Sequence, residues 1–315
     1  MIENREQIQE ITKNLEEGIR NTFQSDKYKA YLNTMSKFHK YSATNVMLIH
    51  QQRPDATCVA GYKSWKRDFN RQVNAGEQAI KILAPNPYRH VVEEPILDKS
   101  GRPRIGADGN ILKKITEEYI VKGYKTVSVF DISQTKGDPL PRLCQELKGT
   151  VKDYENFKEA LERFSPVPFE TISRDTKEFG YYSNMEKKIG IREGLSQIHT
   201  IKTSIHEVAH SILHDVDTGW ANAADVKTKE IQAESIAYTV CQHYGIDTSE
   251  YSFNYVAAWS SGKDLSELKE SMNIIQEASH DMINGIDEKL REIQLEQNRE
   301  VELSNEIEQG YGLSR

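Results

Sequence analysis

The chain has 315 residues, 37% of them hydrophobic, which predicts two domains of ordinary size, each with its own core. No apolar run approaches the roughly 20 residues that cross a bilayer, so we expect no membrane span. The first residues lack the basic and apolar stretches of a secretion signal, and three distant cysteines form no C-x-x-C pair. Both features predict a reduced, cytoplasmic protein.

The net charge of −7 is unevenly distributed along the chain. Residues 1–150 hold 24 Lys and Arg against 18 Asp and Glu, whereas residues 151–315 hold 17 against 30. Within residues 27–89 the basic excess is 11 against 3. This asymmetry favours a polyanionic partner for the first half, although an unevenly charged, solvated surface explains the counts equally well.

In chain order, the first half begins with apolar residues at helical spacing, which predict helices over about 8–23 and 28–38. Ser42 is a suitable N-cap for a third helix, and a helical turn is expected at 63–70. Segments of strand-like composition follow at 56–62, 78–85 and 124–133. Turn-rich residues 86–123 predict exposed hairpin loops, and the proline-containing stretch 136–142 predicts a linker.

The second half alternates between strand and helix patterns. Ser196 is a suitable N-cap for a long helix, and Gly245 a suitable end for the next one. The helices are expected at 153–164, 196–213, 230–245 and 264–293, and the strands at 166–172 and 179–191. The fold class predicted is α+β, with a first domain at 1–146, a mostly helical domain at 150–292 and a polar tail at 293–315.

The sequence His206-Glu207-Val208-Ala209-His210 is a candidate metal site. Residues four apart lie on one face of a helix, so the two imidazoles can bind one ion, with Glu207 beside them. A hydrolytic zinc site needs three protein ligands and an open position, so a third ligand must come from elsewhere. Without one, His206 and His210 would be ordinary helix histidines.

The following helix supplies two carboxylates, Glu230 and Glu234, one turn apart on one face. HEVAH followed by EIQAE resembles the gluzincin arrangement of two histidines on one helix and a glutamate on the next. The resemblance implies that Glu230 is the third zinc ligand and that Glu234 orients a ligand histidine. The reverse assignment, and an acidic solvated face without metal, stay open.

If zinc binds, Glu207 is the natural general base for attack of water on a carbonyl. Candidates for the residue that stabilises the transition state are Tyr238, His243 and Tyr255. His214 is interpreted as a helix-end histidine near the C-terminal dipole. No phosphate-binding or nucleophile-elbow motif competes with this chemistry.

The segment 61–73 combines cations with aromatic residues, as single-stranded nucleic acid requires. The candidate DNA contacts are Lys63, Trp65, Lys66, Arg67 and Arg71. The alternative for Trp65 and Phe69, four residues apart, is that they bury one side of a short helix.

The order of features in residues 41–85 resembles the N-terminal single-stranded-DNA-binding domain of ArdC-type antirestriction proteins. Those features are the Ser-Ala-Thr-Asn turn, Gly61 before Trp65, Gly76-Glu77 and the strand AIKILAP; residues 129–141 resemble the exit of that domain. LtrC-like proteins are similar in layout, and HEVAHSILHD also resembles the peptidase helix of the ImmA/IrrE type. The likeness covers about residues 5–290, but residues 86–123 are longer than the family leads us to expect.

The resemblance implies a protein of a mobile or conjugative element that coats incoming single-stranded DNA, opposes host restriction and carries a zincin-like metallopeptidase domain with Zn²⁺. A host protein or a restriction component is then the expected peptidase substrate. The alternative is a non-catalytic, metal-stabilised DNA-binding or decoy protein whose peptidase fold is inactive. The presence of Glu207 favours the enzyme, because a purely structural metal site needs no base.

Overall fold

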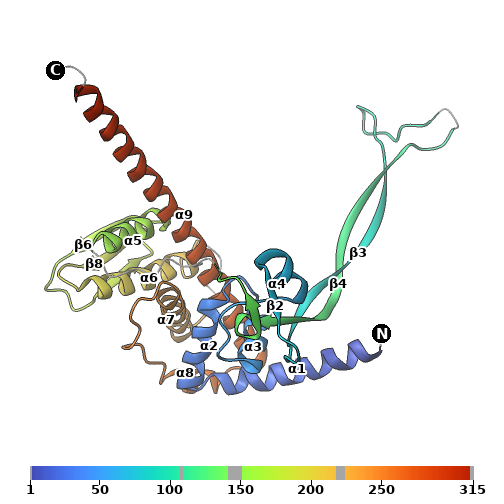
Figure 1. Ribbon diagram of the computed structural model, residues 1–315, viewed down its shortest axis with the longest axis horizontal. Coiled ribbons are helices and arrows are strands. Elements are labelled where there is room, and N and C mark those ends of the chain that lie inside the picture. Colours follow the sequence, from blue (N-terminus) through green and yellow to red (C-terminus); the bar gives the residue numbers. More distant parts are fainter. Residues whose placement is uncertain (1, 107–108, 141–150, 218–223, 313–315) are drawn as a thin grey trace.

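The structure is a computed structural model that describes residues 2–106, 109–140, 151–217 and 224–312. It is an α+β fold in which a β-ribbon and the end of a long helix project from a central body (Figure 1). Among these residues no helix is both long enough and apolar enough to span a bilayer.

The helices of the first half follow its apolar periodicity. Ser42 caps the third of them as expected, because its Oγ accepts a hydrogen bond from the backbone N–H of Asn45 at 3.3 Å. The four helices are α1 (Ile2–Thr22), α2 (Ser25–Lys37), α3 (Ala43–Gln52) and the short α4 (Tyr62–Phe69).

Two small antiparallel sheets complete the first half. One has the strand order β1-β4-β3 and the other pairs β2 with β5. The strands are β1 (Val59–Gly61), β2 (Arg71–Val73), β3 (Ile80–Pro95), β4 (Lys113–Asp131) and β5 (Thr135–Gly137), the last preceded by a 3₁₀ turn, η1 (Ile132–Gln134). The predicted linker at 136–142 therefore begins as part of β5, and residues 141–150, with the predicted domain boundary, lie outside the described residues.

Residues 86–123, expected to be loops, are mostly the outer parts of β3 and β4. Pairing continues from Pro87 opposite Val121 to Pro95 opposite Lys113, after a register shift between Pro85 and Pro87. The turn-rich residues 98–104, 106, 109 and 110 lie at the far end, while β-branched and aromatic residues on both sides keep the strands paired. The result is a two-stranded ribbon that leaves the body (Figure 1).

The second half places a small sheet and two helices around one site. The sheet has the order β6-β8-β7, with β6 and β8 parallel and β7 antiparallel at the edge next to α6. Its elements are α5 (Val151–Phe164), β6 (Phe169–Ile172), β7 (Gly180–Ser183), β8 (Lys188–Arg192), α6 (Gln197–Leu213), α7 (Val226–His243), α8 (Val256–Ser260) and α9 (Leu265–Gly312).

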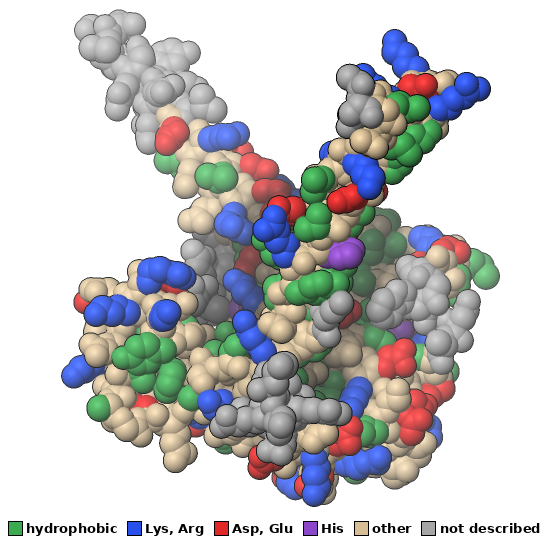
Figure 2. Space-filling view, turned by 90° about the vertical axis from the view of Figure 1, so that its right-hand side faces the viewer, with side chains coloured by type: hydrophobic (Ala, Val, Ile, Leu, Met, Phe, Trp, Pro, Cys, Tyr) green, Lys and Arg blue, Asp and Glu red, His purple; other side chains and the backbone are tan. Residues whose placement is uncertain are grey.

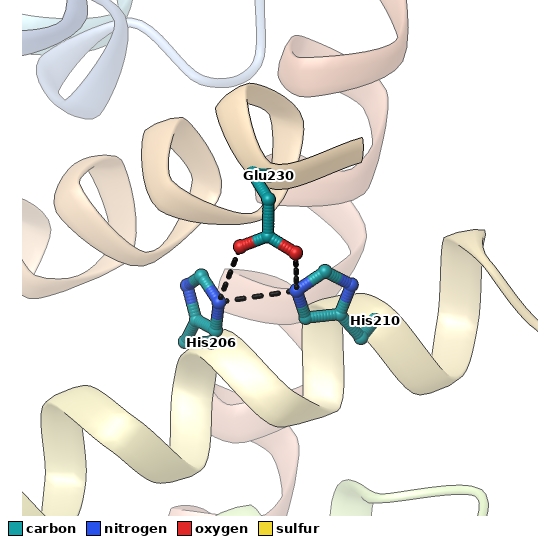
Figure 3. A group of neighbouring side chains, drawn as sticks. All are labelled: His206, His210 and Glu230. Atoms are coloured by element: carbon teal, nitrogen blue, oxygen red, sulfur yellow. Dashed lines mark hydrogen bonds and ion pairs between the residues drawn. The ribbon is translucent and has the colours of Figure 1, made fainter. Parts of the chain in front are cut away.

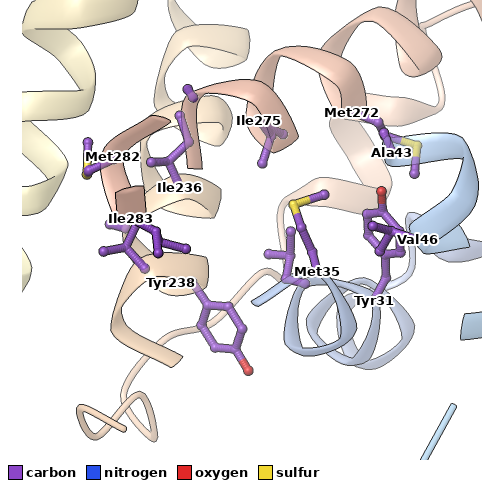
Figure 4. Close-up of a cluster of buried hydrophobic side chains, with 14 of the residues drawn as sticks. Tyr31, Met35, Ala43, Val46, Ile236, Tyr238, Met272, Ile275, Met282 and Ile283 are labelled. Carbon is purple, nitrogen blue, oxygen red and sulfur yellow. The ribbon is translucent and has the colours of Figure 1, made fainter. Parts of the chain in front are cut away.

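The buried side chains form one continuous cluster across both halves, where we expected two separate cores. Helix α2 packs on α7, and residues such as Tyr31, Ile236 and Met272 belong to the same cluster (Figure 4). The hydroxyl of Tyr28 lies 2.8 Å from the Oγ of Ser235, both buried. The first half thus completes its core with helices from the second.

Helix α9 continues far past residue 293, where we expected a polar tail. Its first part buries residues such as Leu268 and Ile286, and its end projects into solvent (Figure 1). Glu, Gln and Arg have high helix propensity, so the polar sequence extends the helix without core contacts. Arg163 of α5 pairs with Glu296 at 2.8 Å and supports the first turns beyond residue 293.

Candidate metal centre and basic surface

Helices α6 and α7 carry the predicted metal ligands, and a side-chain cap fixes the start of each. The Oγ of Ser196 accepts a hydrogen bond from the His199 N–H at 3.2 Å, as predicted, and Asp225 accepts one from the Thr228 N–H at 3.0 Å. The apolar sides of both helices enter the shared core, so the ligands lie on packed elements.

The side chains of His206, His210 and Glu230 converge on one point between the two helices (Figure 3). The two Nε2 atoms lie 3.1 Å apart. The Nε2 of His206 lies 3.6 Å from one carboxylate oxygen of Glu230, and the Nε2 of His210 lies 3.5 Å from the other. One ligand atom from each residue lies within 4.8 Å of the others, and this is the one such group of three that the described residues contain. Two imidazole nitrogens and a carboxylate are the donor set of a catalytic zinc site.

The electrostatics of this group fit a cation at its centre. Burial alone lowers the pKa of His206, but contacts with Glu230 and Glu234 outweigh it and raise the value to about 10. The two histidines in turn lower the pKa of Glu230. The carboxylates therefore stabilise positive charge at this point, carried by a proton or by a metal ion.

Neighbouring groups orient both imidazoles. Glu234 lies 3.3 Å from the Nδ1 of His206, the supporting position predicted for it. His214 contacts His210 Nδ1 with its own Nδ1 at 2.8 Å and Gln232 Oε1 with its Nε2 at 3.1 Å. An amide oxygen only accepts, so His214 donates from Nε2 and accepts at Nδ1, and His210 is left with its Nε2 lone pair facing the centre. His214 is thus the helix-end residue that we expected, and it also fixes a ligand tautomer.

Glu207 lies beside the ligands and is buried. Burial raises the pKa of its carboxyl, while His206 and His210 act in the opposite direction. The backbone N–H of Tyr182, on edge strand β7, hydrogen-bonds to it. Gly180 lets this strand approach α6, because a Cβ there would lie 2.6 Å from Thr203 Cγ2.

Two hollows adjoin the candidate metal ligands. The larger, of about 540 Å³, is lined by residues of α6 and by Phe179, Glu234 and Tyr251. The other, of about 430 Å³, includes His214, Lys229 and Glu230. Glu207 and His206 line both hollows, so the candidate base faces both of them.

The candidates for transition-state stabilisation separate clearly. Tyr238 is buried in the core, and the Nδ1 of His243 donates a hydrogen bond to the carbonyl oxygen of Ser36 at 3.0 Å, away from the candidate metal ligands. Tyr255 is partly exposed, and burial together with the nearby charges of Glu234 and Glu230 raises its pKa. Tyr255 is therefore the candidate that lies near the charges of the candidate ligand group.

Sequence reasoning missed Tyr182, Tyr251 and Lys202. The Lys202 Nζ lies 5.3 Å from the centre of the Tyr251 ring and 3.4 Å from Glu250. Lys202 precedes His206 by four residues, so helical spacing was a usable signal for it. No local signal places Tyr182 or Tyr251 at the site, since both reach it through tertiary packing.

The basic segment of the first half differs from its prediction at Trp65. This side chain is 0% exposed, and its indole N–H donates to the carbonyl of Phe130 at 2.9 Å, so it cannot stack on a base. Phe69 packs against it, with ring centroids 5.1 Å apart. A short amphipathic helix buries its largest aromatic residue because that removes the most apolar surface from water. The core interpretation of the pair is therefore the correct one.

The cations that were predicted to contact DNA fall into two groups, one engaged within the protein and one exposed. Arg71 bridges β2 and β5 through the Thr135 Oγ1 and carbonyl oxygen, at 2.8 and 3.0 Å, so its guanidinium is engaged. Lys63, Lys66 and Arg67 are exposed on α4, and Arg67 forms an ion pair with Asp68. Tyr62 begins the same helix, is 54% exposed and lines a hollow of about 550 Å³ beside β2. Exposed cations and an exposed ring are thus adjacent.

Comparisons with known proteins found similarities in sequence and in structure. A family model of the N-terminal domain of anti-restriction factor ArdC matches residues 3–130. An uncharacterised protein of Bacillus anthracis is 31% identical over 309 residues; the match covers 89% of this chain and 51% of that protein, so the chain spans about half the length of this curated relative. Crystal structures of the antirestriction ArdC protein from plasmid R388 each cover 80% of this chain and 84% of their own, at 19% identity and TM-score 0.45 for the metal-free form and 18% and 0.42 for the Mn(II)-bound form.

Proposed function

We propose that this chain is an ArdC-type antirestriction protein of a mobile or conjugative element, because a family model of the ArdC N-terminal domain matches residues 3–130. In this proposal residues 1–146 bind single-stranded DNA, and residues 150–292 hold a zinc ion in a metallopeptidase-like centre. A host protein or a restriction component, met in the cytoplasm, is the second partner.

The DNA-binding part of the proposal is supported by α4 and its surroundings. Lys63 and Lys66 are exposed on one short helix whose first residue is the exposed Tyr62. Single strands are bound by cations that neutralise phosphates and by rings on which bases stack. Tyr62 takes the stacking role that the sequence suggested for Trp65, and the hollow beside it offers space for a base.

The metal part rests on the donor set, which fits zinc. His206, His210 and Glu230 would be its ligands, and Glu234 and His214 keep the two imidazoles in the tautomers that present Nε2. A divalent cation here supplies a Lewis acid that makes water acidic enough to lose a proton near neutral pH. Chain residues supply everything else in the proposed mechanism.

Glu207 is the proposed general base for peptide hydrolysis. Its carboxylate faces both hollows, and the Tyr182 N–H holds it in place. Burial raises its pKa, which makes it a better proton acceptor than an exposed carboxylate. The proton taken from water then passes to the leaving nitrogen, and Tyr255 is the proposed donor to the developing oxyanion.

An extended peptide is the substrate that the surroundings favour. Strand β7 is the edge of its sheet, where an extended peptide can be added as a further strand, with the Tyr182 N–H already engaged by Glu207. Both hollows are lined by Gly180 of this strand and by His206 and Glu207, so they offer subsites for a peptide that passes the candidate centre.

The single observation that carries the proposal is the convergence of His206, His210 and Glu230 beside Glu207. We expect the full chain, purified without chelator, to contain one zinc and to cleave labelled, unfolded casein, with and without added single-stranded DNA. Glu207→Gln should keep the zinc and lose about 10²- to 10⁴-fold in rate, because an amide accepts no proton. Asp217→Asn, an exposed carboxylate change outside the ligand group, is the matched control. Equal cleavage by Glu207→Gln and the parent protein would remove Glu207 from the mechanism.

A second candidate function, a metal-stabilised DNA-binding protein without peptidase activity, is favoured by one contact. Ser235, next to Glu234, is hydrogen-bonded to Tyr28 of α2, so the metal helices directly support the DNA-binding half. Zinc at one per chain, no cleavage of casein, and single-strand affinity that falls on chelation would together establish this second function.

A further inference from the structure

The distal β-ribbon, here called the arm, consists of residues 86–123, described except for 107–108. Its nine residues from Pro87 to Pro95 alone extend about 30 Å at ~3.3 Å per residue. The arm reaches away from the body and from the metal centre (Figure 1). Neither the single-strand contacts on α4 nor the metal chemistry uses it.

One face of the arm combines exposed apolar side chains with ionic ones. Residues directly opposite in an antiparallel pair share a face, so Val91 lies with Glu117, and Arg89 lies with Tyr119. This face carries Ile115 at 66% and Tyr119 at 71% exposure. The ionic residues among them are paired: Arg89 with Glu117, and Lys113 with Glu93. Large apolar side chains that stay open to solvent beside paired charges favour a binding surface.

The tip of the arm, residues 96–106 and 109–112, carries cations next to apolar side chains. Lys99, Arg102 and Arg104 are exposed there, and none of them forms an ion pair with another described residue. The one described acid of the tip, Asp98, accepts hydrogen bonds from the backbone of Ser100 and Arg102 and thereby serves the turn. Figure 2 shows Lys and Arg side chains beside hydrophobic ones at the end of the arm, at upper right.

We propose that the tip of the arm enters a groove of double-stranded DNA next to a single-stranded region bound on α4. A two-stranded ribbon fits the major groove, and ribbon proteins use it in this way. Lys99, Arg102 and Arg104 neutralise the phosphates that border the groove, and Ile105, 68% exposed, contacts the bases. The inference deepens the proposed function, since it makes a junction of single and double strand the preferred ligand.

Charge favours DNA over a protein partner. Lys114, next to the tip, adds a fourth exposed cation without an ion pair among the described residues. The centres of protein interfaces are depleted in charged residues, whereas this end of the arm carries four cations close together. Four cations without a partner acid among the described residues match the regular negative charge of a duplex.

The test compares three DNA molecules of equal nucleotide length: a single strand, a blunt duplex, and a duplex with a single-stranded overhang. Full-length protein is titrated into each by fluorescence anisotropy at several salt concentrations. In the main variant an Asn-Gly turn replaces residues 89–119, which joins the opposed residues Tyr88 and Ile120 in a two-residue hairpin. A second variant neutralises the tip: Lys99→Gln, Arg102→Gln, Arg104→Gln and Lys114→Gln. Its matched control changes four cations of the second half: Lys158→Gln, Lys227→Gln, Arg291→Gln and Arg299→Gln.

We expect the parent protein to bind the overhang molecule about tenfold more tightly than the single strand at low salt. Both arm variants should lose this preference and keep the parent affinity for the single strand. The salt slope for the overhang molecule should fall by ~0.9 for each duplex phosphate that the variant no longer neutralises. The control should keep both the preference and the slope.

Three results would overturn the inference. One is a parent protein that binds overhang and single strand equally. Another is an arm-shortened variant that keeps the parent preference. The third is an arm-shortened variant that loses the preference together with a smaller oligomeric state by light scattering, which would assign the arm to self-association. Failure of the proposed function looks different, because the parent would then bind none of the three molecules.

Discussion

Helices α6 and α4 both carry a short motif that pointed to function, yet the structure treats the two motifs differently. On α6, His206 and His210 face one point and meet Glu230 from α7. On α4, Trp65 turns into the core, and its neighbours Tyr62, Lys63, Lys66 and Arg67 are exposed. A ligand set constrains direction, because two residues four apart must face the same way. A mixture of cations and rings constrains only composition, so the fold decides which ring is exposed.

Replacement of Trp65 on α4 should have the largest effect. Trp65→Ala should lower the free energy of unfolding by about 3–5 kcal/mol, because it leaves a cavity and a carbonyl without its donor. Chemical denaturation of the full chain measures this, with Tyr62→Ala as the exposed control of nearly unchanged stability. If the Trp65→Ala protein has the stability of the parent but no longer binds single-stranded DNA, the indole contacts DNA after all.

Removal of the metal tests the other helix. At free zinc ~1,000-fold above its dissociation constant, binding stabilises the folded chain by about 4 kcal/mol, and chelation should remove this. The melting temperature should fall with chelator in the parent protein and in Glu207→Gln, but not in His210→Ala, which has already lost a ligand. If chelation changes neither the melting temperature nor the zinc content of the parent, the ligand group on α6 and α7 does not hold the metal.

The free energy of unfolding should also depend on pH, through a buried histidine at the interface of the two halves that belongs to neither motif. His39 is buried, and its ring lies 4.8 Å from that of His243 and 5.6 Å from that of His280. Burial, then these neighbours and Lys40, lower its pKa to about 4. Because the unfolded chain binds this proton more readily, stability is complete above about pH 6.5 and falls as the pH approaches 4, by up to about 3 kcal/mol. His39→Phe should flatten this part of the stability profile, and an unchanged slope in that variant would contradict the assignment.

Tyr62 provides a smaller and more specific change on α4. If its ring stacks on a base, Tyr62→Ala should cost about 1–3 kcal/mol of single-strand affinity and leave the salt slope unchanged. Anisotropy titration across salt concentrations measures both quantities. Tyr62→Phe is the control, since it keeps the ring, and it should bind as the parent does. Equal affinity of all three proteins would show that no base stacks there.

The smallest expected effect concerns the cations of the same helix. Lys63→Gln with Lys66→Gln should flatten the salt slope for single strands by ~0.7 for each phosphate that is left without its lysine. The same pair of changes at Lys227 and Lys229, on α7, should leave the slope intact. A steeper slope, or equal flattening by both pairs, would place the phosphate contacts elsewhere.

Local patterns accounted for most helices and for the group of candidate ligands. Ser42 and Ser196 cap the helices expected of them, and Glu230 and Glu234 lie 3.6 and 3.3 Å from the two ring nitrogens of His206. These features depend on neighbours within a few residues or on a match to a known spacing. The ligand role of Glu230 and the presence of zinc stay predictions until the metal is measured.

Features that depend on distant contacts were missed. The ribbon depends on pairing between β3 and β4 across a turn-rich tip, and turn signals alone suggested loops. The shared core brings Tyr28 to Ser235 across 207 residues of sequence, a distance at which periodicity carries no information. Tyr182 reaches Glu207 only because β7 packs on α6.

The contact between Tyr28 and Ser235 also implies a delay in folding while the chain is being synthesised. Helix α2 leaves the ribosome early, but its partner α7 follows after 207 further residues. At ~5–20 residues per second, that interval lasts about 10 to 40 seconds. Throughout it, the aromatic face of α2 lacks the surface that covers it in the finished protein, so we expect chaperones to hold the first half until α7 has been made.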